Sequence, residues 1–229
     1  DLVYLGNKGL MLKRLAAMGF PIPPGFIITT EVFRCLPAIL AHDELREENV
    51  HKIFAYINKL EKTTGWEFGN PDNPLLLSVR SGASMSMPGM LDTFLNVGMN
   101  PDIAEGFARH TGAPWSAWDS YRRFLQLWGM SYGISRDVFD GLMRDAKARA
   151  SVAKKSSLPP ERMKELAMIY RKTLSSYGVE LVDDPQLQLR MCVDQVLASW
   201  TTEKAKLYRQ QMQIAEEWGT AVIIQTMVY

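Results

Sequence analysis

Residues 75–92 read LLLSVRSGASMSMPGMLD, and this stretch holds the pattern that decides the fold. Its first five residues are apolar or small and follow Pro74, which predicts a strand covered on both faces. Arg80 stands at the end of that run, and no other charge follows until Asp92. Because a buried unpaired charge is costly, the guanidinium needs a partner. This partner is either a structural carboxylate such as Asp92 or a ligand phosphate, which arginine can hold with two parallel hydrogen bonds.

The loop after Arg80, SGASMSMPGM, carries no charge of its own. Its small residues and flexible methionines suit a mobile cover that excludes water from a phosphate chain. A plain turn packed by methionine side chains is the alternative interpretation.

A second cation lies near the N-terminus, in the sequence LGNKG of residues 5–9. Lys8 stands beside glycine, where the backbone can approach a ligand closely, and a helix is predicted to start just after it. Helix N-termini favour anions, and lysine adds a mobile point charge for phosphate. The pattern is not a Walker A motif, which needs GxxxxGK followed by Ser or Thr. A surface lysine at an ordinary helix start is the alternative.

The rest of the chain predicts an α+β unit interrupted by a helical insert. Residues 1–99 mix helices and strands, whereas residues 100–199 show apolar residues at helical spacing throughout. One such stripe consists of Trp118, Tyr121, Leu125 and Trp128. Asp184 followed by Pro185 predicts a helix start, with Asp184 as the cap and proline at the first helical position. Residues 200–229 then contain one more helix, around 203–217, and an apolar run that predicts a strand returning to the first unit.

Composition excludes several classes of function. The formal net charge is +1, so no global field points to nucleic acid or to an anionic membrane. No run of 18 or more apolar residues predicts a membrane-spanning helix. Cys35 and Cys192 are two in number and far apart in sequence, which is typical of reduced thiols in a cytoplasmic protein.

Metal and hydrolase chemistry have no pattern in this sequence. The three histidines, His42, His51 and His110, lack ligand spacing and are expected on the surface. No nucleophile-elbow motif is present. The chain opens without Met and closes on an apolar run, and we therefore expect it to be part of a longer polypeptide.

Four segments resemble the nucleotide-binding end of the pyruvate phosphate dikinase family. These segments occur in the family's order and span nearly the whole chain: LGNKGLMLKRLAAMGFPIPPGFIITTEVF, PLLLSVRSGASMSMPGMLDTFLNVGMN, EGFARHTGAPWSAWDSYRRFLQ and WGTAVIIQTMVY. Related phosphoenolpyruvate synthases and water dikinases keep a similar strand end, but SMPGMLDT resembles the dikinase branch in particular.

The resemblance implies an ATP-grasp fold, with ATP between two subdomains. This chain would supply the first subdomain and its helical insert, and would end near the hinge. Family chemistry moves the β-phosphoryl of ATP to a histidine on a separate swivelling domain. Inorganic phosphate takes the γ-phosphoryl to give pyrophosphate, and the phosphohistidine converts pyruvate to phosphoenolpyruvate. The full-length protein would be a homodimer, and carboxylates beyond residue 229 would hold Mg²⁺.

The resemblance also implies roles for particular residues. Lys8 matches the phosphate lysine, and Arg80 matches the triphosphate-binding arginine, which we assign a catalytic role. Met227 and Val228 would approach the adenine at the hinge. The phosphate-covering loop would contribute the remaining ATP-binding residues, which are Ser86, Met87, Pro88, Gly89, Met90, Asp92 and Thr93.

Two positions depart from the family pattern. Asn7 replaces the usual second glycine of GGKG, which would restrict the backbone beside Lys8, and Ser84 replaces a frequent basic residue. Either change would weaken phosphate binding or alter the phosphate acceptor. Two alternatives therefore stay open: a phosphoenolpyruvate synthase-like enzyme that uses water, and a non-catalytic module that senses nucleotide or binds a partner.

Overall fold

A computed structural model describes residues 2–228 of the chain, and its contacts divide the chain into two compact units. Unit 1 comprises Asp1–Trp66, Leu77–Thr93 and Leu189–Tyr229. Unit 2 comprises Glu67–Leu76 and Phe94–Gln188. Two elements, β3 (Thr93–Val97) and α9 (Pro185–Ser199), each continue from one unit into the other.

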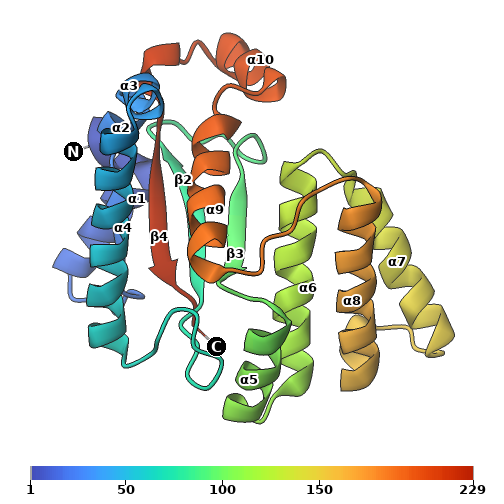
Figure 1. Cartoon of the computed structure of the whole chain (residues 1–229). Coiled ribbons are helices and arrows are strands. Elements are labelled where there is room, and N and C mark those ends of the chain that lie inside the picture. The colour runs from blue at the N-terminus through green and yellow to red at the C-terminus, as the bar shows by residue number, and fades with distance from the viewer. Residues whose placement is uncertain (1, 229) are drawn as a thin grey trace. The chain divides into compact units, whose positions relative to one another are not determined.

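Unit 1 combines helices with antiparallel strands, which confirms the predicted α+β class. Its other elements are α1 (Leu2–Ala17), β1 (Gly25–Ile28), α2 (Thr30–Arg34), α3 (Leu36–Ala41), α4 (Asp43–Thr64), β2 (Leu77–Ala83), α10 (Glu203–Met212) and β4 (Thr220–Thr226). Strand β4 lies between β1 and β2 and is antiparallel to both. Figure 1 shows β4 beside β2. All seven residues of β4 are buried, as expected for a β-branched, apolar central strand.

Side chains alternate between the two faces of this sheet. Ile27 of β1 faces α1, since a Cβ added to Gly9 would lie 2.8 Å from the Ile27 Cδ1 atom. The neighbouring Phe26 faces the other way and stacks on Tyr56 of α4, with ring centroids 5.2 Å apart. Helix α1 therefore covers one face, and α4 lies against the other.

Arg80 lies at the centre of β2, so the prediction that it ends the strand is wrong. The small residues 81–83 continue the ladder by pairing with residues 220–222, and Gly82, which has no side chain, permits the close contact with α1. Arg80 itself pairs with Ile223, and Ile223 pairs with Ile27 on its other side. Directly paired residues project to the same face, so Arg80 faces α1.

Unit 2 is mainly helical. Its helices are α5 (Pro101–Thr111), α6 (Pro114–Ser131), α7 (Arg136–Arg149) and α8 (Pro160–Ser176), with a short 3₁₀ turn at Lys155–Ser157. The predicted apolar stripe of α6 is buried, namely Trp118, Tyr121, Leu125 and Trp128. Beside it, the buried Asp119 carboxylate pairs with Arg122 at 2.8 Å and with Lys155 at 2.7 Å.

Two helix ends test the sequence analysis directly. Asp184 begins α9 as its cap, because its carboxylate oxygen accepts a hydrogen bond from the Leu187 N–H at 2.7 Å. The helix predicted around 203–217 ends earlier, at Met212, because Gln213 adopts a left-handed conformation with φ 54°.

The division into 1–99, 100–199 and 200–229 stays a prediction about family domains. None of the helices within residues 2–228 has both the length and the apolar composition of a membrane-spanning segment.

Candidate functional site

The polypeptide bends at Gly6, which separates two helical segments of α1. Gly6 has φ 68° and ψ 174°, and an added Cβ would lie 1.7 Å from the Gly82 carbonyl oxygen. Only glycine permits both this positive φ and this close approach. The second segment starts directly afterwards, so Lys8 lies in its first turn, where free N–H groups favour anions. The helical residues before Gly6 were not predicted, because four residues are too few to show a period.

Lys8 is held beside the end of β2. Its ammonium donates a hydrogen bond to the Ser81 carbonyl oxygen at 3.2 Å. Lys8 as a whole residue is exposed, but its ammonium is partly buried and loses some of its surrounding water. The pKa of Lys8 is lowered, first by this burial and second by the positive charge of Arg80. Two cations therefore lie close enough to repel each other.

Arg80 is half-buried, and within residues 2–228 no hydrogen bond or ion pair holds its guanidinium. The carboxylate considered as its structural partner, Asp92, meets the charge of Lys204 instead. Burial is the larger influence on Asp92 and raises the pKa of that carboxyl. The structural-carboxylate explanation for Arg80 thus has no support in the described part of the chain.

Two cavities share Asn7 and Lys8 of α1 as lining residues. The first has a volume of about 290 Å³ and is lined by Asn7, Lys8, Met11, Leu12, Leu15, Arg80, Ile223 and Gln225. The second has a volume of about 300 Å³ and is lined by Asn7, Lys8, Ser81, Ala83, Met85, Ser86, Met87, Pro88, Gly89, Leu91 and Thr93. Neither set includes a carboxylate, so the only charges on these walls are positive.

The segment that joins β2 to β3, taken with the first residue of β3, is called the methionine loop (residues 84–93), and it lines the second cavity. Of its predicted site residues, five line this cavity: Ser86, Met87, Pro88, Gly89 and Thr93. The loop turns at Gly89, which has φ 70°, and the Met90 N–H donates to the Met87 carbonyl at 3.2 Å. The structure therefore brings this part of the loop and Lys8 around one space.

The remaining predicted site residues line neither cavity. Met90 packs against a hydrophobic cluster, and Asp92 donates its N–H to the Ser199 Oγ atom at 3.2 Å. Met227 and Val228 follow the end of β4, and Val228 is 74% exposed. Their contact with adenine stays a prediction.

Residues of β4 that the sequence analysis did not single out do line the first cavity. Ile223 and Gln225 project from alternate positions of β4 toward α1. Ile223 is paired with Arg80, and Gln225 is paired with Ser78, two residues nearer the start of β2. At about 3.3 Å per residue, the first cavity extends along β4 for roughly 7 Å from the level of Arg80. Successive side chains of the strand AVIIQT, residues 221–226, point to opposite faces of the sheet. The sequence could not show which of them face α1, because that depends on the register with the neighbouring strands.

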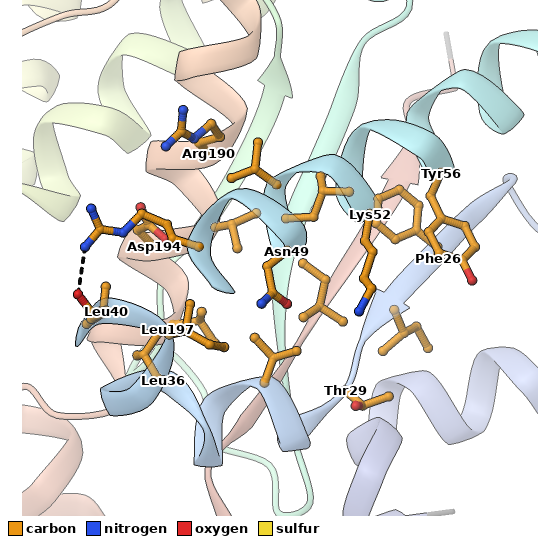
Figure 2. Close-up of a pocket in the computed structure, with 18 residues that line it drawn as sticks. Phe26, Thr29, Leu36, Leu40, Asn49, Lys52, Tyr56, Arg190, Asp194 and Leu197 are labelled. Carbon is orange, nitrogen blue, oxygen red and sulfur yellow. Dashed lines mark hydrogen bonds between the residues drawn. The ribbon is translucent and has the colours of Figure 1, made fainter. Parts of the chain in front are cut away.

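A different cavity, of about 270 Å³, lies against the opposite face of β1 (Figure 2). Its walls are mainly apolar side chains from β1, α3, α4 and α9. Arg46 also lines it, and its guanidinium donates to the Leu40 carbonyl oxygen at 2.9 Å, the bond drawn as a dashed line at the labelled Leu40 in Figure 2. Asp194 also lines it, and burial raises the pKa of that carboxyl while Arg190 and Arg46 lower it. Arg46, Lys52 and Arg190 line this cavity as well, so its charged side chains are of both signs, whereas those of the two cavities lined by Lys8 are all cations.

Metal ligands do not gather in the described residues. Residues 2–228 contain no group of three or more His, Cys, Asp or Glu side chains that could hold a metal ion. The donor set of the described residues therefore does not fit Mg²⁺. His42, His51 and His110 are exposed, which confirms their predicted surface positions. Of the two free cysteines, Cys192 is buried and Cys35 is exposed.

Comparison with known proteins connects this site to a family. The family described as pyruvate phosphate dikinase, AMP/ATP-binding domain, matches residues 35–229. A pyruvate, phosphate dikinase of Clostridium symbiosum is 39% identical over 230 residues, which cover 98% of this chain and 26% of that protein. The corresponding protein of Rickettsia prowazekii is 39% identical over 227 residues, with the same two shares. That of Entamoeba histolytica is 37% identical over 229 residues, again covering 98% and 26%.

The chain spans about a quarter of the length of these relatives. The family match covers most of the chain, including β2, the methionine loop and β4, and the pairwise matches extend it to the segment around Lys8. By these matches, the chain belongs to the AMP/ATP-binding domain family of pyruvate phosphate dikinase.

Proposed function

We propose that this chain binds ATP, with the triphosphate held between Lys8, Arg80 and the loop of residues 86–93. The observation that carries the proposal is a pair of neighbouring cations on cavity walls that include no carboxylate. Such a pair is unfavourable when the cavities hold only water and becomes favourable when an anion lies between the two charges. The family's description as an AMP/ATP-binding domain supports the same assignment.

Each side chain has a distinct role in this proposal. Arg80 presents a planar guanidinium that can grip phosphate oxygens with two parallel hydrogen bonds. Lys8 supplies a point charge, already oriented by its hydrogen bond to Ser81. The loop around Gly89 lines the second cavity together with Lys8, and its N–H groups are the third set of donors in this proposal. Together they stabilise the negative charge that develops on the transferring phosphoryl group and exclude water from it.

We further propose that the full-length protein is a phosphotransferase of the dikinase type. ATP gives its β-phosphoryl to a histidine of a separate swivelling domain, and its γ-phosphoryl joins inorganic phosphate as pyrophosphate, so AMP remains. The phosphohistidine then gives its phosphoryl to pyruvate, which forms phosphoenolpyruvate. The names of the relatives support this scheme. Mg²⁺ held by carboxylates beyond residue 229, a homodimer and a cytoplasmic location belong to the same proposal.

The two alternative functions, a synthase-like enzyme and a non-catalytic module, were suggested by the departures from the family pattern at Asn7 and Ser84. Asn7 lies within α1 at a negative φ, so position 7 does not need a glycine for its backbone, and the bend is made at Gly6. Asn7 also lines both cavities, where its amide can donate to phosphate. Ser84 lines neither cavity. These observations favour a working ATP site over a module that has lost it.

The experiment that tests the proposal follows the products of the full-length protein. It is mixed with ATP, Mg²⁺, pyruvate and phosphate, and AMP, pyrophosphate and phosphoenolpyruvate are measured over time. Formation of pyrophosphate that depends on added phosphate supports the dikinase. AMP without pyrophosphate would identify the synthase-like enzyme. No AMP, combined with no binding of Mg-ATP, would show that the cavities serve another function.

A further inference from the structure

A hydrophobic cluster lies under the methionine loop, within unit 1. Its buried residues are Ala83, Met87, Trp200, Ala205 and Ile214, and the partly buried Phe33, Met90, Leu91 and Tyr208 pack against them. We call the residues of this cluster outside the loop the socket, namely Phe33, Ala83, Trp200, Ala205, Tyr208 and Ile214. Met87 is only 8% exposed, whereas Met85, two residues earlier, is 42% exposed. The loop thus turns one methionine inward between exposed neighbours, and this side chain fills a space formed mainly by residues far along the chain.

The socket is held in place independently of the loop. The Trp200 indole N–H donates to the Glu216 carbonyl oxygen at 3.0 Å. The guanidinium of Arg209 lies 4.4 Å from the centroid of the Trp200 ring, and it also donates to the Trp200 carbonyl oxygen. Arg209 is 2% exposed and lies 3.6 Å from a Glu216 carboxylate oxygen. Trp200 is therefore fixed on several sides by α10 and the turn that follows it.

Two polar contacts tie the loop to the same region, one on each side of Met87. The Tyr208 hydroxyl donates to the Ser86 carbonyl oxygen at 3.4 Å. At the other end, the Asp92 N–H donates to Ser199 Oγ at 3.2 Å. Residues 86–92 are thus attached at both ends and through the inward side chain of Met87.

We infer that Trp200 and Tyr208 are positioning residues that hold the loop at the distance from Lys8 which the triphosphate requires. This inference rests on the proposed function of the loop as the cover of the phosphate site. Met87 belongs to the hydrophobic cluster and also lines the second cavity together with the loop residues on either side of it, so the depth at which Met87 sits sets where their N–H groups lie. A loop ordered before ATP arrives loses less conformational freedom on binding, which favours affinity. Neither Trp200 nor Tyr208 lines the cavities, so both act through the loop.

Loop mobility can be measured in the full-length protein without nucleotide. A nitroxide spin label is attached at the exposed position 85 in a Met85→Cys variant. The exposed thiol of Cys35 and any other reactive thiol are replaced, while the buried Cys192 can stay. We expect an immobilised label that becomes mobile when Met87→Ala is added. Met87→Leu fills the socket again and should restore the immobilised signal, whereas Met168→Ala, at a 40% exposed methionine of α8, should change nothing.

Kinetics then separate positioning from chemistry. Met87→Ala should raise the KM for ATP about tenfold or more with a smaller effect on kcat, and Met87→Leu should rescue it. Tyr208→Phe removes only a hydroxyl from a half-buried side chain, so it keeps the fold and should raise the KM about threefold. Trp200 is 2% exposed, and its replacement would disturb folding, so it is not the primary variant.

The outcomes distinguish the inference from the function on which it rests. A label that stays immobilised in Met87→Ala would overturn the socket as the loop's anchor. A label that becomes mobile while the KM for ATP is unchanged would keep the anchor and overturn the assignment of the loop to the phosphates. Increased mobility together with a raised KM and rescue by Met87→Leu would support both.

Discussion

Removal of the Arg80 charge should change stability and ligand binding in opposite directions. Arg80→Met keeps the length of the apolar stem but removes the guanidinium. Without ATP, the protein should become slightly more stable, because Lys8 loses a repulsive neighbour and no described partner is left unpaired. With ATP, the same variant should lose most of the ligand's stabilising effect.

The magnitudes follow from the contacts that Arg80 can make. Relief of repulsion between two partly solvated cations is worth at most about 1 kcal/mol and decreases with added salt. Two hydrogen bonds from a charged group contribute roughly 3 kcal/mol or more, so ATP affinity should fall about 100-fold, which corresponds to about 2.7 kcal/mol. At an ATP concentration about 100 times the original Kd, ligand stabilisation should fall from about 2.7 to about 0.4 kcal/mol.

Thermal and urea unfolding of the full-length protein, with and without Mg-ATP, measure both effects. Arg171→Met is the matched control. Arg171 donates two hydrogen bonds of 2.6 Å to the Asp183 carboxylate and one of 2.8 Å to the Tyr121 hydroxyl. Its removal should lower stability without ATP and leave ATP stabilisation unchanged. If Arg80→Met behaved like this control, Arg80 would be a structural residue and the reasoning would be refuted.

Three further predictions concern stability. Gly6→Ala should destabilise by at least about 1–3 kcal/mol in urea unfolding, because its Cβ would overlap the Gly82 carbonyl at a positive φ; an unchanged midpoint would contradict this bend. Asp119→Ala should cost about 3–5 kcal/mol, because it leaves the buried Arg122 without its carboxylate; a loss below 1 kcal/mol would argue against it. Burial raises the folded-state pKa of Asp92, so that carboxyl stabilises the fold below its ordinary pKa of 3.8, and the benefit disappears as pH rises through the raised value. Asp92→Asn should therefore be more stable than the original near pH 7 and show no advantage near pH 3 in unfolding measured across this range.

The sequence pointed to the site residues that carry charge or special backbone geometry. Lys8 and Arg80 could be chosen because each is a lone cation in an otherwise neutral stretch, and such isolation is visible in the sequence. The helix start at Pro185 could be predicted from its Asp184 cap, since capping is a local interaction. The seven-residue strand β4 was visible as an apolar, β-branched run.

The location of Arg80 within β2 depended on information outside its own segment. Residues 81–83 are too small and neutral to predict a strand, and they belong to β2 only because β4 offers hydrogen-bonding partners. The lining of the first cavity by Ile223 and Gln225 also required the register between β4 and its neighbours, since a shift of one residue would turn both side chains away.

The sequence alone thus determined which residues are candidates for phosphate binding, because charge, glycine and capping patterns act over a few neighbouring positions. Only the tertiary structure decided that Lys8 and Arg80 adjoin the same cavity, and that Met87 turns inward while Met85 remains exposed. The physical reason is that burial depends on packing between distant segments. Met87 and Trp200 are separated by more than a hundred residues, and no local period can report their contact.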